Sequence, residues 1–512
     1  MITHELCENK PLVILDEGEI WRGVEANVVY WSEIDIAANC ISIPSLVDAH
    51  GTELKHKYIV LIQELSNKVI LGKSVKQHLE ITEHLSFWWL TLLSEKSPWK
   101  SKEIYSVFKA IILESILIDY KGKEVIVLSN NSALRKWLKA KVKNSDKNII
   151  IRTGKPDNHF NLLSWKRWLP HSLQAILFII RFIVQFKAQL FSEKRLPATL
   201  LNAKNVKTIV TYSDNIDMNA FSTGKVYSGY WSGLDQYFYL SNSVIHWLMI
   251  FVPSKEFPCL ATALDSRNKG FNNNSQQVIF LEEFLSIKVL YKIVRRYITL
   301  TLRTSKISSL LNDENDILYF LNADWLSSIR GVSATDGCIK LSLFEEALNR
   351  LPIKNNIGKG LYVYENQAWE RALVYLWKKR TSQEIIGFQH TSGKHYDLRP
   401  FDAYSLDGVN TDYDDELLPD KVVVTGDAAK FEMQRNQFPN ERLFIAESLR
   451  NLYLKNCVQN FSKTEGADNQ LTLLVVTDYI PSVTVQQLKL VSESWGEISK
   501  MFEKVIIKPH PN

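Results

Sequence analysis

The 512-residue sequence has few cysteines and lacks the short motifs of several common enzyme classes. Its five cysteines are far apart and form no CxxC pair, which argues against a disulfide framework and against a zinc site. The sequence contains no GxxxxGKS/T, no GxGxxG after a strand, no HExxH and no GxSxG. These absences argue against P-loop kinases, simple dehydrogenases, zinc peptidases and common serine hydrolases.

Strong charge and targeting signals are also missing. The net charge of +5 is too weak to indicate nucleic acid as a partner. The N-terminus carries Glu5 and Glu8 and has no basic-then-apolar leader, so we expect a protein that is not exported. The sparse cysteines suit a reducing cytoplasm, which is the compartment that the sequence predicts.

The longest apolar stretch, Ser172–Phe186, is interrupted by Arg181 and Gln185. It is shorter than the ~20 apolar residues of a spanning helix. Basic and aromatic residues flank it from Trp165 to Arg195, a pattern typical of a helix that lies in a membrane interface. The stretch therefore predicts one of two things. It is either a buried helix or, over 165–195, a contact with the inner face of the cytoplasmic membrane.

Apolar runs that end in polar residues recur along the chain. Near the N-terminus, Pro11–Gly18, Lys57–Ser66 and Lys123–Asn131 predict strands of this kind, with helical stretches between them. Val206–Asp214 and Lys359–Gln367 repeat the pattern farther on. Strands that alternate with helices indicate a parallel sheet with helices on its faces, so we predict an α/β fold.

The segment PDKVVVTGDAA, which starts at Pro419, predicts the first strand of a new lobe. We therefore expect an N-terminal lobe over 1–415, with a helical insertion near 160–200, and a C-terminal lobe over 416–512.

Candidate catalytic residues follow three of the predicted strands. In open α/β sheets, ligands bind beyond the carboxyl ends of the strands. Asp214, Glu365 and His390 each lie just after an apolar run. A carboxylate there can act as a base or nucleophile, and a histidine can move a proton or contact a phosphate. The alternative is structural: the acids would cap the next turn, and backbone groups would satisfy the histidine. For Arg399 the sequence favours a surface ion pair.

A second group of polar residues follows the strands of the C-terminal part: Gly426, Asp427, Asp478, Lys508 and His510. The last two belong to Lys508-Pro509-His510-Pro511. There the prolines restrict the backbone and direct the histidine away from the strand end. A lysine and a histidine in this arrangement predict a phosphate contact, whereas the structural alternative is a loop punctuated by proline.

Four segments together resemble a family of bacterial surface-carbohydrate biosynthesis proteins linked to O-antigen and capsule assembly. They are YENQAWERAL from Tyr364, GFQHTSGKHYDLR from Gly387, PDKVVVTGDAA from Pro419 and KPHP from Lys508. The set is also similar to the wider group of two-lobed (GT-B) glycosyltransferases that use CMP-activated acidic sugars, such as Kdo and sialic-acid-like nonulosonates. The resemblance spans most of the chain, from LVILDEG onward.

This resemblance implies two Rossmann-like lobes. A nucleotide-binding lobe of this family continues for several more strands and helices after the KPHP segment, so we expect the C-terminal lobe, which ends at Asn512, to be incomplete. The first would hold the acceptor and the catalytic carboxylate, Asp214 or Glu365. The second would bind the nucleotide, with His510 on its phosphate and with Thr425–Asp427 and Asp478–Thr484 lining the pocket. The implied partners are a nucleotide sugar and a glycan or lipid-linked glycan acceptor, in lipopolysaccharide or capsule synthesis. The implied transfer needs no metal ion and no cofactor beyond the CMP-linked donor.

The sequence leaves three functions open. The first is the metal-independent glycosyltransferase. A DxD pattern, typical of metal-dependent sugar transferases, occurs at Asp412-Tyr413-Asp414, but it lies in a polar linker and we interpret it as solvated. The second is a CDP-polyol phosphotransferase of the teichoic-acid type. The third is a non-catalytic, truncated homologue that acts within a polysaccharide assembly complex.

Overall fold

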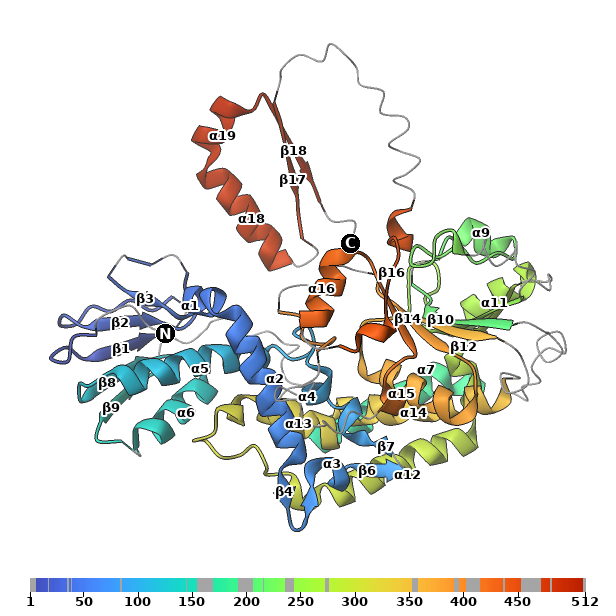
Figure 1. Ribbon diagram of the computed structural model, residues 1–512, viewed down its shortest axis with the longest axis horizontal. Coiled ribbons are helices and arrows are strands. Elements are labelled where there is room, and N and C mark those ends of the chain that lie inside the picture. Colours follow the sequence, from blue (N-terminus) through green and yellow to red (C-terminus); the bar gives the residue numbers. More distant parts are fainter. Residues whose placement is uncertain are drawn as a thin grey trace. The chain divides into compact units, whose positions relative to one another are not determined.

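The computed structural model of the protein describes residues 6–16, 18–34, 36–37, 39–82, 85–143, 145–153, 169–191, 206–214, 216–234, 244–271, 276–351, 358–390, 396–401, 415–435, 438–452, 471–478 and 481–509. The chain divides into two compact units, Met1–Asn451 and Leu452–Asn512. The predicted α/β fold is confirmed, because both of the larger sheets are parallel and helices connect their strands (Figure 1).

The N-terminal part of the first unit holds a five-stranded sheet in the order β3-β2-β1-β8-β9, parallel throughout. Its strands are β1 (Leu12–Leu15), β2 (Asn27–Tyr30), β3 (Ile41–Ser42), β8 (Glu124–Leu128) and β9 (Asn148–Arg152). Strand β1 is buried along its whole length. A central parallel strand needs such a continuous apolar sequence, because helices cover both faces of the sheet.

Four helices accompany this sheet: α1 (Ile43–Ala49), α2 (Gly51–Asn67), α5 (Glu103–Asp119) and α6 (Ser132–Lys143). The prediction of a strand at Lys57–Ser66 is wrong, because this segment lies within α2. The buried residues of α2 include Leu54, Tyr58, Ile62 and Leu65. They recur every three or four positions, which is the period of a helix and not of a strand.

Two short hairpins and three helical turns connect α2 to α5. They are β4 (Val69–Ile70) with β5 (Lys73–Ser74), β6 (Glu80–Thr82) with β7 (Leu85–Ser86), α3 (Val75–His78), η1 (Phe87–Leu90) and α4 (Leu92–Glu95). Helix α4 contributes to the site at the other sheet, since Ser94 and Glu95 at its end bond to the helix that begins at Ala368.

The rest of the first unit is built on a seven-stranded parallel sheet in the order β12-β11-β10-β13-β14-β15-β16. Its strands are β10 (Val206–Tyr212), β11 (Val244–Ile250), β12 (Gln276–Phe280), β13 (Lys359–Val363), β14 (Ile385–Phe388), β15 (Lys421–Val424) and β16 (Leu443–Ile445). One continuous apolar core includes residues from this sheet and from the five-stranded sheet, among them Leu12 and Ile209.

The helices of this region are α7 (His171–Leu190), α9 (Met218–Ser222), α11 (Leu260–Gly270), α12 (Ile287–Arg303), α13 (Asn322–Arg330), α14 (Val332–Arg350), α15 (Ala368–Arg380) and α16 (Asp427–Arg435). Helix α15 packs closely on β13. A Cβ atom on Gly360 would lie 2.6 Å from the Trp377 ring, so a glycine is needed for this approach. The contact packs the end of α15 against the start of β13.

Strand order reverses at one point in each large sheet. From β1 the chain proceeds to β2 and β3 on one side and then returns to β8 on the other side. In the larger sheet the same reversal lies between β10 and β13. Ligands of doubly wound α/β proteins bind outside the carboxyl ends of the strands at such a reversal. Each sheet therefore has one position where a ligand site is expected.

The lobe boundary that we expected near residue 415 does not coincide with the division of the structure. The strand after Pro419 is β15, which pairs in parallel with β14 and continues the seven-stranded sheet. The carboxylate of Asp420 accepts a hydrogen bond from the Ile385 amide (2.8 Å), which ties the start of β15 to β14. The compact second unit begins later, at Leu452.

The described part of the second unit forms a β-α-β arrangement. Strands β17 (Thr472–Val476) and β18 (Lys504–Lys508) pair in parallel and are joined by α18 (Pro481–Glu493) and α19 (Trp495–Met501). These elements agree with the strands and helix predicted from the sequence. The register places Val476 opposite Lys508, so the polar residues after both strands lie at the same edge.

Candidate functional site

The polar residues predicted from the sequence lie at the reversal of the seven-stranded sheet. Asp214 follows β10, Glu365 follows β13 and His390 follows β14. Parallel strands end at the same edge, so these three residues come from one side of the sheet. The site is therefore built on the carboxyl edge of three neighbouring strands.

Glu365 is at the centre of this site. Its Oε1 lies 3.3 Å from His390 Nε2, and its Oε2 accepts a hydrogen bond from Arg399 Nη1 at 2.9 Å. The Gln367 amide also donates to Oε2. Burial tends to raise the pKa of Glu365, but the Arg399 guanidinium, the neighbouring His390 ring and the hydrogen bond from Gln367 outweigh it and lower that pKa below its usual value. Glu365 is therefore an ionised carboxylate at neutral pH.

Arg399 is held from the other side by Asp397. Its Nε and Nη2 donate to the two carboxylate oxygens of Asp397 at 2.9 and 2.7 Å, in a two-bond fork. Both residues are only 8% exposed. Burial disfavours the charge of Arg399, but Asp397 and Glu365 raise the pKa of the guanidinium overall. The expectation of a surface ion pair at Arg399 is therefore wrong, because the pair is buried.

His390 is a largely buried, neutral histidine, with a side chain that is 10% exposed and with Nε2 next to Glu365. Burial lowers the pKa of His390 below its usual value, although the Glu365 charge acts in the opposite direction. The edge of the ring packs against Tyr230, with ring centroids 4.8 Å apart at 84°. Its Nδ1 is buried and has no hydrogen-bond partner within the described part of the chain. A carboxylate accepts a proton and does not donate one, so the proton of the neutral ring belongs on Nε2.

Carboxyl groups fix the turn after Glu365 by accepting hydrogen bonds from its backbone amides. Asn366 has a left-handed backbone (φ 56°) and donates from its side chain to the Arg399 carbonyl at 2.5 Å. Glu370, in the first turn of α15, accepts from the Glu365 amide at 3.0 Å and from the Asn366 amide at 2.7 Å. Glu95 accepts from the Ala368 amide at 3.3 Å. These bonds hold Glu365 in one orientation.

Asp214 differs from Glu365 in its surroundings. It is exposed, yet the protein around its carboxyl group raises its pKa, and the negative charge of Glu365 raises it further. The pKa values of the two acids are thus moved in opposite directions. A pair of this kind is typical of sites where one carboxyl group is ionised and the other retains a proton more readily.

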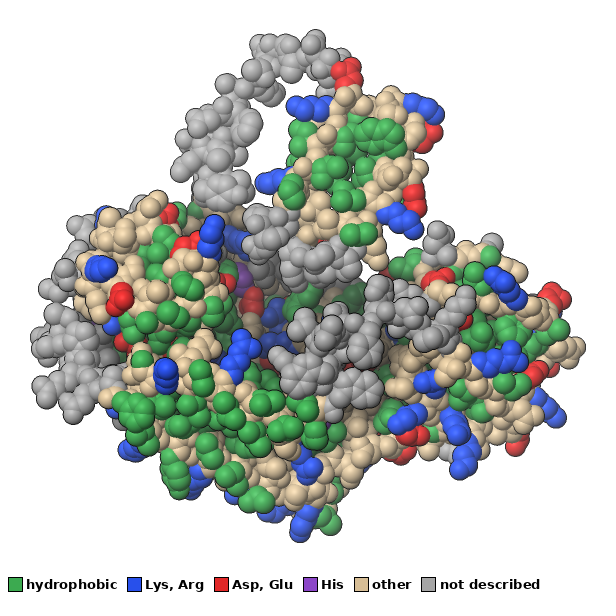
Figure 2. All heavy atoms as spheres, turned by 180° about the vertical axis from the view of Figure 1, so that it is seen from behind, with side chains coloured by type: hydrophobic (Ala, Val, Ile, Leu, Met, Phe, Trp, Pro, Cys, Tyr) green, Lys and Arg blue, Asp and Glu red, His purple; other side chains and the backbone are tan. Residues whose placement is uncertain are grey.

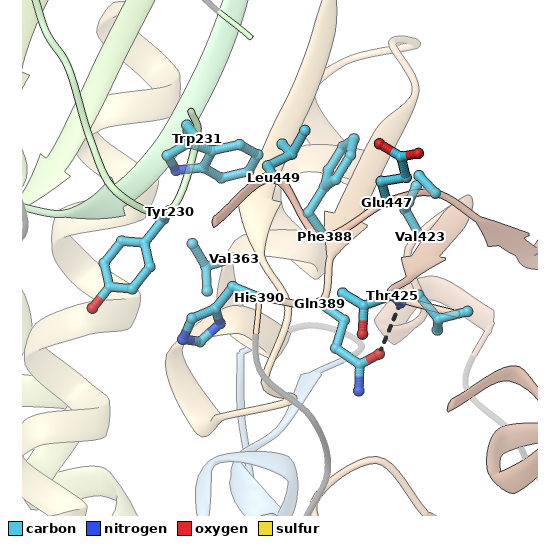
Figure 3. A pocket seen from close by; sticks show the side chains of 12 residues that line it. Tyr230, Trp231, Val363, Phe388, Gln389, His390, Val423, Thr425, Glu447 and Leu449 are labelled. Carbon is cyan, nitrogen blue, oxygen red and sulfur yellow. Dashed lines mark hydrogen bonds between the residues drawn. The ribbon is translucent and has the colours of Figure 1, made fainter. Parts of the chain in front are cut away.

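A small cavity lies beside His390, under the ends of β14 and β15 (Figure 3). Its volume is 10 Å³, which is room for roughly one water molecule. Figure 3 shows Tyr230 and His390 side by side at one end of the cavity. At the other end, the Gln389 side chain accepts a hydrogen bond from the Thr425 amide at 3.4 Å. Glu447 and Leu449 line the cavity from the segment after β16.

The remaining predicted site residues are divided between the two units. Gly426 (φ 149°) and Asp427 form the turn from β15 into α16, next to the site in the first unit. Asp478 and Lys508 lie in the second unit, where the Thr477 amide donates to the Lys508 carbonyl at 3.1 Å. His510 lies outside the described residues, as do Asp412 and Asp414. The structure thus brings Glu365 and His390 into contact.

Several contributors to the site were missed by sequence reasoning. Tyr230 contacts His390 from a distant part of the chain, and Glu370 reads in the sequence as an ordinary acid in the first turn of a helix. For Arg399 the sequence did contain a signal, because this residue follows Asp397 by two positions in a segment that begins at the end of a strand. Nothing in the local pattern indicates that these side chains converge on Glu365.

No family model, curated protein or solved structure matches the chain. Among the described residues, no group of three or more histidine, cysteine, aspartate or glutamate side chains is arranged to hold a metal ion.

Proposed function

We propose that this protein is a glycosyltransferase of bacterial surface-polysaccharide synthesis, which moves a sugar from a CMP-linked donor to a glycan acceptor. The proposal depends on one observation: His390 presents Nε2 to the ionised Glu365 carboxylate, 3.3 Å away, and keeps a buried Nδ1 without a partner among the described residues. This pair lies at the strand reversal, where α/β enzymes bind their ligands. The resemblance of four sequence segments supports the donor class and the two-lobed GT-B assignment.

The chemistry follows from the tautomer of His390. Glu365 holds the proton on Nε2, so the Nδ1 lone pair is the basic site of the ring. Because Nδ1 is buried beside a cavity with room for about one water, it accepts the proton of an acceptor hydroxyl group through a water molecule. As that proton leaves, the acceptor oxygen attacks the anomeric carbon of the donor sugar. The bond from this carbon to the phosphate oxygen breaks, and the CMP phosphate takes the electron pair. Arg399 and Asp397 keep Glu365 ionised and oriented throughout, and so they position the base.

Asp214 supplies a second group in this scheme. Its raised pKa makes Asp214 a stronger base than an ordinary aspartate, which suits a carboxyl group that exchanges a proton with the acceptor or with a bound water. Glu365 orients His390 in the proposal, so Asp214 is the better candidate for the catalytic carboxylate of the first lobe. The negative donor phosphate would meet the turn at Gly426, where the N-terminus of α16 presents backbone amides. Asp478, Lys508 and His510 stay in the proposal as nucleotide contacts of the second unit.

A CDP-polyol phosphotransferase is the second candidate, because the same pair of residues would activate a hydroxyl group for attack on phosphorus. The reacting hydroxyl group needs a base in either reaction. The two functions differ in the donor, CMP-sugar or CDP-polyol, and therefore in the nucleotide that stabilises the protein.

The first test is a thermal-shift titration with CMP, CDP, UDP and GDP. A ligand that binds only the folded state adds about 2.7 kcal/mol of stability at 100 times its dissociation constant. We expect a shift with CMP that His510→Ala reduces. The matched control is His50→Ala, at the corner between α1 and α2. A response to CDP alone would replace the sugar transferase by the phosphotransferase, and no response to any nucleotide would support the non-catalytic alternative.

The second test follows release of CMP from a CMP-linked nonulosonate, with water or a glycan as acceptor. We expect His390→Ala to lower the rate about 10²–10⁴-fold, the usual contribution of a general base, with CMP binding preserved. Glu365→Gln should lower it less, because an amide can still accept from Nε2. A rate in His390→Ala equal to that of His50→Ala would refute the assignment of the base, whatever the nucleotide specificity.

A further inference from the structure

Two helices of the first unit expose apolar stripes to solvent. Helix α7 is apolar on both faces: Ala175 and Phe186 are buried, whereas Ile176, Ile180 and Val184 are 48%, 51% and 62% exposed. The exposed residues recur every four positions, so they form one continuous stripe. A helix with a second apolar face that is not buried indicates an interaction surface.

Helix α12 carries a similar exposed stripe that sequence reasoning did not single out. Ile287, Tyr291, Ile298 and Leu302 are 60%, 67%, 51% and 68% exposed, with Arg295 between them. The opposite face of α12 is buried through residues such as Val289, Ile293 and Leu300. The stripe is therefore a second surface of a well-anchored helix, and its exposure does not result from a loosely packed segment.

The two helices are held by the same part of the fold. Both pack against α13 and α14. The Tyr297 hydroxyl of α12 donates to the Arg330 carbonyl at 2.7 Å, and His171 at the start of α7 lies against the next residue, Gly331. Figure 2 shows a large group of hydrophobic side chains on one face of the molecule, with lysine and arginine at its edges.

The charged residues of these two helices have one sign. Neither α7 nor α12 contains an aspartate or a glutamate. The exposed basic residues on and next to the two helices are Arg181, Lys187, Lys288, Arg295, Arg303 and Lys306. By contrast, Lys292 and Arg296 on the packed side of α12 pair with Glu345. A surface of apolar stripes edged by cations matches the boundary between the acyl chains and the headgroups of an anionic membrane.

We infer that α7 and α12 together form a docking face for an anionic lipid bilayer, with the exposed stripes in the interface and the basic residues on the headgroups. By length and composition, α7 is the one described helix that could cross a membrane. Its other face is occupied, however, because Phe186 packs edge-on against Phe251 at 6.2 Å. If α7 crossed the membrane, it would lose these contacts and Arg181 would lie within the hydrocarbon. If α7 docks in the interface, the contacts remain and Arg181 stays at the level of the headgroups.

The experiment is cosedimentation of the full chain with vesicles of phosphatidylglycerol or of phosphatidylcholine. We expect binding to phosphatidylglycerol that weakens as salt rises. Two triple variants test the face: Ile176→Gln, Ile180→Gln and Val184→Gln on α7, and Ile287→Gln, Tyr291→Gln and Ile298→Gln on α12. Each should weaken binding about tenfold or more. The matched control is Ile118→Gln on α5, a residue that is 66% exposed and should have no effect.

Circular dichroism and melting temperature verify that the variants fold, as expected for substitutions of exposed residues. Equal binding to phosphatidylcholine would contradict the charge argument, and an effect of the α7 variant alone would contradict the two-helix face. Resistance of the membrane-bound protein to carbonate extraction would indicate a spanning α7 and overturn interfacial docking. Loss of self-association in these variants, without loss of vesicle binding, would show that the face is an interface between copies of the chain.

Discussion

The two large sheets of the first unit share a topology and differ in the chemistry at their reversal points. In the five-stranded sheet, Asp16 follows β1 and accepts hydrogen bonds from the hydroxyl groups of Ser129 (2.5 Å) and Ser32 (3.1 Å). In the seven-stranded sheet, Glu365 follows β13 and is paired with Arg399 and His390. Topology provides the position of a site in both, and the loop residues decide whether the acid there is bonded to hydroxyl groups or to arginine and histidine.

This difference has a physical consequence. Hydroxyl groups satisfy a carboxylate without adding a group that titrates near neutral pH, so the edge at Asp16 is suited to a structural role. Histidine adds a proton that can move, and arginine fixes the charge state of the acid beside it. The seven-stranded sheet is therefore the one on which proton transfer is expected, and three perturbations test the comparison.

The largest effect is expected from Arg399→Leu, which leaves Asp397 and Glu365 buried without their cation. Removing one member of a buried ion pair costs about 3–5 kcal/mol of folding stability. Urea denaturation measures the free energy of unfolding. The matched control is Lys421→Leu, whose pairing with Glu384 is more exposed and worth about 0–1 kcal/mol. Equal losses in the two variants would mean that the buried network contributes no more than a surface pair.

A somewhat smaller effect is expected inside the sheet, at His246 of β11. The residue is 1% exposed, both ring nitrogens lack partners among the described residues, and burial lowers the pKa of His246 to about 4. The unfolded chain binds this proton near pH 6.5 and the folded chain only near pH 4, so stability falls as the pH decreases through that window. The loss approaches about 3 kcal/mol at full protonation, since one pKa unit is worth about 1.4 kcal/mol.

His246→Leu isolates this contribution. The variant keeps an apolar side chain of similar size and should lose less stability than the wild type between pH 7 and pH 4, as measured by the urea midpoint at each pH. None of the five strands around β1 contains a histidine, so they cannot contribute such a slope. Parallel pH profiles for the two proteins would exclude His246 as the source of the acid sensitivity.

The smallest effect is expected from Ser32→Ala, at the Asp16 edge of the five-stranded sheet. The substitution removes one of the two hydroxyl bonds to Asp16 and should cost about 1 kcal/mol. Release of CMP from the donor should not change, because Asp16 belongs to the other sheet. A large loss of CMP release in Ser32→Ala would reverse the comparison and assign chemistry to the five-stranded sheet.

The sequence predicts the strands of the first unit well where apolar runs are short and end in polar residues. It predicts Glu365 and His390 as site residues for the same reason, since each follows such a run. It fails at Lys57–Ser66, where five adjacent apolar residues, Tyr58–Ile62, obscure the helical period. It also fails at Pro419, because a strand that joins an existing sheet has the same local pattern as one that begins a new lobe.

The contacts that determine the behaviour of Glu365 lie beyond any local pattern. Arg399 is 34 residues away along the chain, and Tyr230 reaches His390 from the segment between β10 and β11. The exposure of the α12 stripe is equally non-local. Its sequence alternates like that of any surface helix, and only the packing of α13 and α14 reveals that both of its sides are apolar. These features arise from tertiary structure, which sequence periodicity does not encode.

In the turn between β13 and α15, carboxylates of the chain itself bind the backbone amides. The amides of Glu365, Asn366 and Ala368, which in many α/β proteins would cradle a phosphate, are occupied by Glu370 and Glu95 of the chain itself. These amides therefore cannot bind a phosphate unless Glu370 and Glu95 move away, so a phosphate-bearing ligand is not expected at the start of α15.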